Sequence, residues 1–270
     1  MREGFYAVCA PPLTRRRFLA CAVLASMAPV CPAAVAAAGD LTPGVRRFIE
    51  RYAITTEDPW ALVHAIRGLG RHCRLHGESA VAYVLRSSVR VQEVHQRRYL
   101  YIPTPLEVHS NMFLKTLLEA GVPLTEPFAL DGRVFHLQDL GEGAKARFRF
   151  DPTTFDRHDL AWSLIAFAEL QAHTWENAYG ERIQLTEIVR FGLQVLDEAT
   201  AELKPYAAAQ RPLPRKMAIH GYTCGGTHLC YSLVVAAKHG LLPAAGGAIL
   251  QEQLQLLLYR LQADPDLIER

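Results

Sequence analysis

The sequence predicts an all-α protein built as a single helical domain. After residue 39, apolar residues recur at three- and four-residue spacing along most of the chain, which is the pattern of amphipathic helices. Glycine or proline closes nearly every such segment, as is typical of helix ends. Several segments share a polar start, an apolar body with small residues and a terminal glycine. We therefore expect an array of helical pairs or an α/α toroid.

The helices follow one another through the chain, and local signals mark their ends. Acids and Pro59 start the segment 56–70, which ends at Gly70. Ser110 or Asn111 caps the next strong segment, which glycine and proline then stop. The predicted helical segments, in chain order, are 42–53, 56–70, 77–89, 107–123, 137–150, 157–173, 186–206, 226–240 and 247–265.

Two stretches depart from the helical pattern. Residues 99–102 are aromatic or aliphatic, and Pro103 and Pro105 stop the run, so we expect at most a minor strand there. Residues 204–216 hold three prolines and several basic residues, which predicts a long surface loop.

The N-terminus carries an export pattern. Residues 14–19 read Thr-Arg-Arg-Arg-Phe-Leu, an apolar run follows to about residue 30, and the alanines at 36–38 offer a cleavage site before Gly39. This pattern resembles the twin-arginine signal peptide, although Ala20 stands where lysine is usual. The resemblance implies a signal at 1–38, a mature helical domain at 39–270, and translocation of the folded chain by the twin-arginine machinery. It also implies a periplasmic or secreted location, and it favours a cofactor inserted before export.

A retained membrane anchor is the alternative for the same segment. The stretch from Phe18 to Ala38 is uncharged and about long enough to span a bilayer. Pro29, Pro32 and the abundance of alanine disfavour a permanent helix. After cleavage we expect no stable membrane span.

Charge and cysteine content narrow the function classes. The signal holds four of the 29 basic residues and one of the 27 acidic ones, so the mature chain carries 25 and 26 and is nearly neutral. It lacks the clustered basic face of a nucleic-acid-binding protein. Three cysteines remain, Cys73, Cys224 and Cys230, which allows at most one disulfide. The sequence leaves open whether Cys73 pairs with Cys230.

The stretch HGYTCGGTHLCYS, residues 220–232, is a candidate metal centre. His220, Cys224 and His228 lie four residues apart, and Gly225-Gly226 would bend the chain so that the three side chains approach one another. Cysteine and histidine suit zinc, with copper as an alternative. His64 joins as a ligand if the helices converge on one cavity. A reactive thiol paired with histidine, or a plain turn into a buried helix, would explain the same residues.

A second candidate site lies ahead of the helix 107–123. Glu107, His109 and Asn111 alternate there, and Glu107 is a candidate general base. Glu107 could instead only interact with the helix dipole. Between two later helices, residues 173–182 combine aromatic and polar groups, including Glu176 as another candidate base. That stretch suits a sugar- or peptide-binding wall, or an ordinary loop over buried aromatics.

Together these features predict an exported hydrolase that acts on a cell-envelope substrate. The candidate catalytic residues are Glu107, His109 and Cys224. The candidate zinc ligands are His220, Cys224, His228 and His64. The alternatives are a non-catalytic helical binding module and a periplasmic metal carrier.

Overall fold

The computed structural model describes residues 43–54, 57–214 and 216–268. The chain divides into two compact units, residues 1–48 and 49–270. The predicted signal at 1–38, with its anchor alternative, lies outside the described residues. Within the described ranges, no helix has the length and apolar character needed to cross a membrane.

The described chain is mostly helical, as the sequence predicts. Asp58 caps one helix by accepting a hydrogen bond from the Trp60 amide, and Ser79 caps another at Ala82. The α-helices are α3 (Pro43–Tyr52), α4 (Pro59–Leu69), α5 (Ala80–Ser88), α6 (Met112–Glu119), α7 (Leu137–Arg147), α8 (Leu160–Glu169), α9 (Leu185–Thr200), α10 (Leu203–Ala209), α11 (Thr227–Lys238) and α12 (Gly246–Ile268), with the 3₁₀ helices η1 (Ala218–Gly221) and η2 (Thr223–Gly226).

Strand content exceeds the prediction of a minor strand near 99–102. That segment falls within a hairpin, and three further antiparallel hairpins are present in the described residues. At one hairpin turn, Asp131 and Gly132 both have positive φ, as a tight two-residue hairpin turn requires. The strand pairs are β1 (Arg74–Leu75) with β2 (Glu78–Ser79), β3 (Arg90–Val94) with β4 (Arg97–Tyr101), β5 (Pro127–Leu130) with β6 (Arg133–His136), and β7 (Thr174–Glu176) with β8 (Arg182–Gln184).

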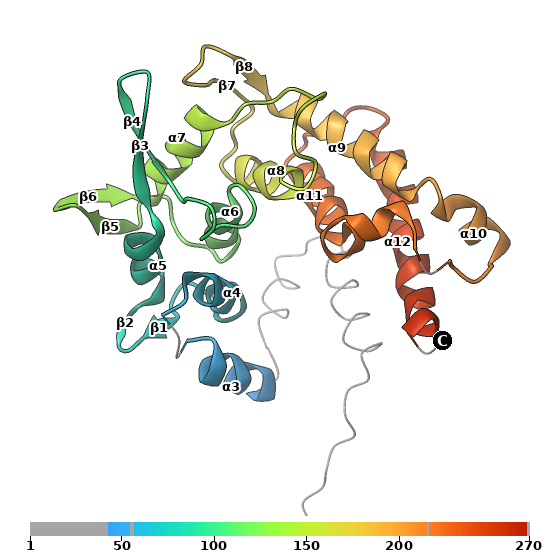
Figure 1. Ribbon diagram of the computed structural model, residues 1–270, viewed down its shortest axis with the longest axis horizontal. Coiled ribbons are helices and arrows are strands. Elements are labelled where there is room, and N and C mark those ends of the chain that lie inside the picture. Colours follow the sequence, from blue (N-terminus) through green and yellow to red (C-terminus); the bar gives the residue numbers. More distant parts are fainter. Residues whose placement is uncertain (1–42, 55–56, 215, 269–270) are drawn as a thin grey trace, which may run out of the picture. The chain divides into compact units, whose positions relative to one another are not determined.

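All four hairpins of the described residues join consecutive helices. The order helix, hairpin, helix occurs at α4–α5, α5–α6, α6–α7 and α8–α9 (Figure 1). Helix α4 packs on α6, α6 packs on α8, and α8 packs on α11. The loops that precede α6, α8 and α11 therefore lead into neighbouring helices.

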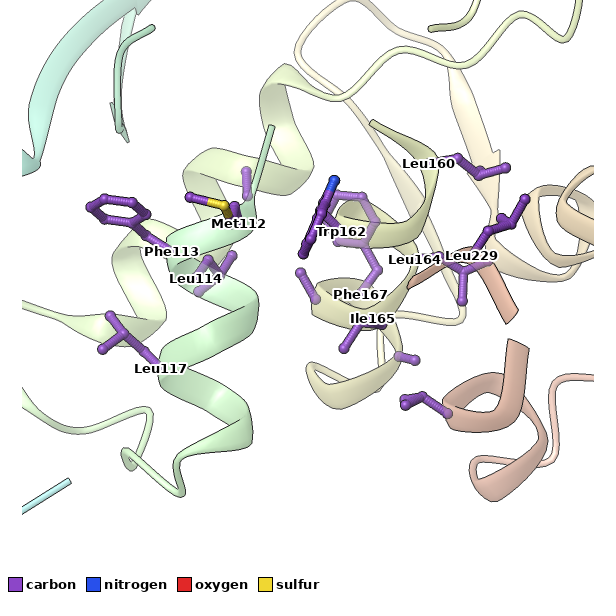
Figure 2. Close-up of a cluster of buried hydrophobic side chains, with 14 of the residues drawn as sticks. Met112, Phe113, Leu114, Leu117, Leu160, Trp162, Leu164, Ile165, Phe167 and Leu229 are labelled. Atoms are coloured by element: carbon purple, nitrogen blue, oxygen red, sulfur yellow. The ribbon is translucent and has the colours of Figure 1, made fainter. Parts of the chain in front are cut away.

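Helix α8 lies at the centre of the core. Every residue from Leu160 to Ala168 is buried, as expected for a helix that is packed on all sides. Figure 2 shows Trp162 on the side of α8 toward α6, and Leu160 and Leu164 on the side toward Leu229 of α11. Burial of each such side chain stabilises the fold by about 1.5 to 3 kcal/mol. Polar residues at the start of α8 are consequently held on a rigid element.

The predicted surface loop at 204–216 is partly helical. Helix α10 (Leu203–Ala209) occupies its first half, and a loop follows through the prolines at 212 and 214. The run of three alanines at 207–209 explains the helix, because alanine has the highest intrinsic helix propensity.

Candidate functional site

A loop between β4 and α6 buries the carboxyl group of Glu107. The side chain is 7% exposed, and its Oε1 accepts a hydrogen bond of 2.6 Å from the backbone amide of Phe113. The pKa of Glu107 is raised to about 8, first by burial and to a smaller extent by the nearby Asp159. The amides of Phe113 and Asn111 and the charge of Arg147 oppose this rise but do not cancel it. At neutral pH the carboxyl group is therefore mostly protonated.

The same loop is bound to the start of α8 through Asp159. Ser110 Oγ donates a hydrogen bond of 2.7 Å to Asp159 Oδ2, and His109 Nδ1 lies 3.3 Å from Asp159 Oδ1. The His109 ring also stacks on Trp162, with 4.9 Å between ring centroids. Asp159 and Trp162 together fix the orientation of the imidazole.

Asn111 adds a second connection between the loop and α8. Its backbone is left-handed, with φ +66, a conformation that asparagine tolerates better than most residues. Its side-chain amide donates a hydrogen bond of 3.0 Å to Ser163 Oγ, and Ser163 is 1% exposed. The end of the loop that leads into α6 is thus bound to α8 through consecutive residues, Ser110 and Asn111.

A pocket of about 430 Å³ is lined by Glu107, Ser110, Asn111, Asp159 and Ser163, among others. That volume falls within the range of about 300 to 1,000 Å³ that is usual for small-molecule sites. A smaller adjoining cavity of about 20 Å³ shares part of the same wall. Both are lined by Glu107, Asn111 and Arg147; Ser110, Asp159 and Ser163 line only the larger one.

Helix α7 forms the opposite wall because it crosses β4 closely. Gly143 faces the backbone of Leu100, and a β-carbon at this position would collide with the Leu100 carbonyl oxygen. The absence of a side chain brings the end of α7 to the end of β4. Arg147 therefore lies over the Tyr101 ring, with its guanidinium carbon 4.5 Å from the ring centroid.

Two histidines, His109 and His228, lie against the ring of Trp162. The His228 ring lies 4.4 Å from the Trp162 ring. The pKa of His228 is lowered to about 4, first by burial and then by the charges of Lys115, Arg67, His109 and His64. His228 is therefore a neutral imidazole at neutral pH. The meeting of His64, His109, His220 and His228 in one cavity stays a prediction. His64 is exposed, and its Nδ1 lies 2.7 Å from the Trp60 carbonyl oxygen.

His220 and Cys224 both lie at the surface. His220 is exposed, and its Nδ1 accepts a hydrogen bond of 3.2 Å from the amide of Met217. Cys224 is also exposed, in a turn where Gly225 and Gly226 both have positive φ. The predicted glycine bend is confirmed. Among the described residues, however, no three His, Cys, Asp or Glu side chains come close enough to hold a metal ion. The ligand set His220, Cys224, His228 and His64 stays a prediction.

The three cysteines within the described residues are all free thiols. Cys73 and Cys230 are buried, and burial raises the pKa of Cys230 to about 12. Burial also raises the pKa of Cys73. Neither pairs in a disulfide, which resolves the question that the sequence leaves open.

The aromatic stretch 173–182 contributes less to the pocket than its composition indicates. Trp175 packs on Phe167, with 4.9 Å between centroids, and its indole donates a hydrogen bond to the Lys145 carbonyl oxygen. Glu176 is exposed on β7 and does not line the pocket.

The sequence patterns did not point to Arg147, Asp159 or Ser163. Asp159 stands directly before a strong helical pattern, a typical capping position that could have marked it. Arg147 and Ser163 have no local signal.

No family model, curated protein or solved structure matches the chain.

Proposed function

We propose that the chain is an exported hydrolase that cleaves a cell-envelope polymer at the pocket containing Glu107 and Asp159. The observation that carries this proposal is that two carboxyl groups in different environments line one pocket. Glu107 is buried and mostly protonated, whereas Asp159 is partly exposed and holds hydrogen-bond donors. Such a pair suits general acid and general base roles, and enzymes that hydrolyse glycosidic bonds use it.

The two carboxyl groups divide the chemistry between them. Asp159 removes a proton from a water molecule, and the water oxygen forms a bond to the sugar carbon. The bond from that carbon to the leaving oxygen breaks, and Glu107 donates its proton to the leaving oxygen. Asp159 then releases its proton to solvent and Glu107 takes one up, which restores both groups.

His109 and Ser110 position the base in this scheme. They contact the two different oxygens of Asp159, and each oxygen keeps a lone pair for water. His109, a candidate catalytic residue from its sequence position, acts here through Asp159 because it does not itself line the pocket.

We also propose export of the protein, an array of helical pairs and a zinc site. The twin-arginine pattern supports export to the periplasm or beyond, with the translocation machinery as partner. The repeated order of helix, hairpin and helix supports a helical-pair array, or in its closed form an α/α toroid.

Zinc at His220, Cys224, His228 and His64 is tested separately by elemental analysis of the processed protein and of Cys224→Ala. Stoichiometric zinc that disappears in the variant would support it.

The hydrolase is tested by incubating the processed protein with purified cell-envelope polysaccharides and measuring new reducing ends. Glu107→Gln and Asp159→Asn should each lower the rate by about 10²- to 10⁴-fold, the usual contribution of an acid or base. Glu93→Gln, which alters an exposed carboxylate on β3, is the matched control and should retain the wild-type rate. Undiminished hydrolysis in both pocket variants would refute the assignment. Ligand binding without hydrolysis by the wild type would favour the binding module.

A further inference from the structure

Arg147 presents a positive charge to the pocket without an opposing partner. Among the described residues, its guanidinium has neither a hydrogen-bond acceptor nor an ion-pair partner, and its contact is the face of the Tyr101 ring. Burial lowers the pKa of Arg147, which shows that the guanidinium has lost part of its hydration. Arginine nevertheless stays charged at neutral pH. A partly desolvated cation at a pocket wall is a binding group for an anion.

The neighbouring charges do not neutralise Arg147. Glu107 is close enough to influence it but is mostly protonated at neutral pH. Arg149 also lines the pocket, and it is already paired with Glu181 through hydrogen bonds of 2.5 and 2.9 Å. Of these two arginines, Arg147 is therefore the one that could still form an ion pair with a ligand carboxylate.

The rest of the pocket wall suits a sugar ring. Tyr101, Phe148 and Phe155 offer aromatic surface, and hydroxyl and amide groups lie opposite on the loop and on α8. Aromatic faces bind the apolar faces of sugar rings, while polar groups fix the hydroxyls. A ligand with both a ring and a carboxylate would use the aromatic wall and Arg147 at once.

We infer that the pocket binds an acidic polysaccharide, with the carboxylate of one sugar unit held by Arg147. This names the substrate class of the proposed hydrolase and rests on that function only for the cleavage step. A carboxylate fits better than a phosphate because Asp156 and Asp159 line the same pocket. Their negative charges repel a dianion more strongly than a monoanion.

Binding is measured by calorimetry on the Glu107→Gln protein, so that cleavage does not interfere. The probes are a galacturonic acid trisaccharide and the neutral galactose trisaccharide. We expect the acidic probe to bind at least tenfold more tightly than the neutral one. Arg147→Met should remove this preference and Arg147→Lys should keep part of it. Arg133→Met, at an exposed arginine on β6 outside the pocket, should keep all of it. Melting temperatures of all variants establish that they are folded.

The outcomes separate this inference from the proposed function. Equal binding of the two trisaccharides, or a preference that Arg147→Met leaves intact, overturns the inference even if the wild type hydrolyses a neutral polymer. An Arg147-dependent preference in a protein that hydrolyses nothing supports the inference and refutes the hydrolase. Displacement of the acidic trisaccharide by equal concentrations of acetate or inorganic phosphate would show a general anion site and would overturn the sugar assignment.

Discussion

Replacement of Glu107 by glutamine should change how the stability of the protein depends on pH. The carboxyl group has an ordinary pKa of 4.5 when the chain is unfolded and a pKa of about 8 in the folded protein. Below pH 4.5 it is protonated in both states. Between pH 4.5 and 8 the unfolded chain releases this proton while the folded protein retains it, so the wild type loses stability as the pH rises.

The size of the effect follows from the distance between the two pKa values. At about 1.4 kcal/mol per pH unit, the rise from 4.5 to about 8 corresponds to roughly 5 kcal/mol of stability lost across this interval. Glutamine cannot ionise, and its side-chain oxygen can still accept the hydrogen bond from the Phe113 amide. The stability of Glu107→Gln relative to the wild type should therefore rise from pH 4.5 to 8 and stay level above pH 8.

Denaturant unfolding of both proteins at pH 5, 7 and 9 measures this difference, and other titrating groups cancel in the subtraction. Glu93→Gln, with its exposed carboxylate, is the control for loss of a surface charge. A difference between wild type and Glu107→Gln that is the same at pH 5 and pH 9 would show that burial does not hold the proton on Glu107. The general acid of the proposed mechanism would then be lost.

Three further predictions address the local structure. Gly143→Ala should destabilise the protein by about 1 to 3 kcal/mol, the usual effect of overpacking, because the new methyl group meets backbone that cannot move aside; thermal unfolding tests this, and an unchanged melting temperature would contradict the close crossing of α7 and β4. Gly225→Val should lower the melting temperature by several degrees, since φ is +57 and a β-branched residue is strained there; unchanged melting would contradict the bend. In the folded, processed chain a water-soluble thiol reagent should label Cys224 and spare Cys73 and Cys230, and labelling of three thiols without denaturant would refute their burial.

Long helices were predictable from the sequence because their signal is local and repeated. The centres of α4, α6 and α8 fall within their predicted segments, since each carries apolar residues at helical spacing and a stop at its end. Three of the four described hairpins were missed because their strands are only two to four residues long, too short for alternation to be visible. The Asp131-Gly132 pair was the strongest available signal, as such pairs favour tight hairpin turns.

Of the candidate site, the residues of the loop before α6 were predictable, and their partners at the start of α8 were not. Glu107, His109 and Asn111 stood out because they lie together in the sequence. Their partners Asp159 and Ser163 are about 50 residues away, and the contacts exist only because α6 packs on α8. The predicted metal site gained no support for a related reason. The four-residue spacing of His220, Cys224 and His228 does not determine where their side chains point. The glycine bend formed as expected, and Cys224 nevertheless remains exposed while His228 packs on Trp162.

The contacts of Trp162 with His109 and His228 give the protein a built-in optical reporter. The chain contains three tryptophans, and this one is buried with two imidazole rings close to it. The fluorescence of an indole ring is sensitive to the charge of a neighbouring imidazole. The fluorescence emission of Trp162 therefore responds to changes both in the loop that carries His109 and in α11. A ligand that displaces His109 would change this emission before any product is formed.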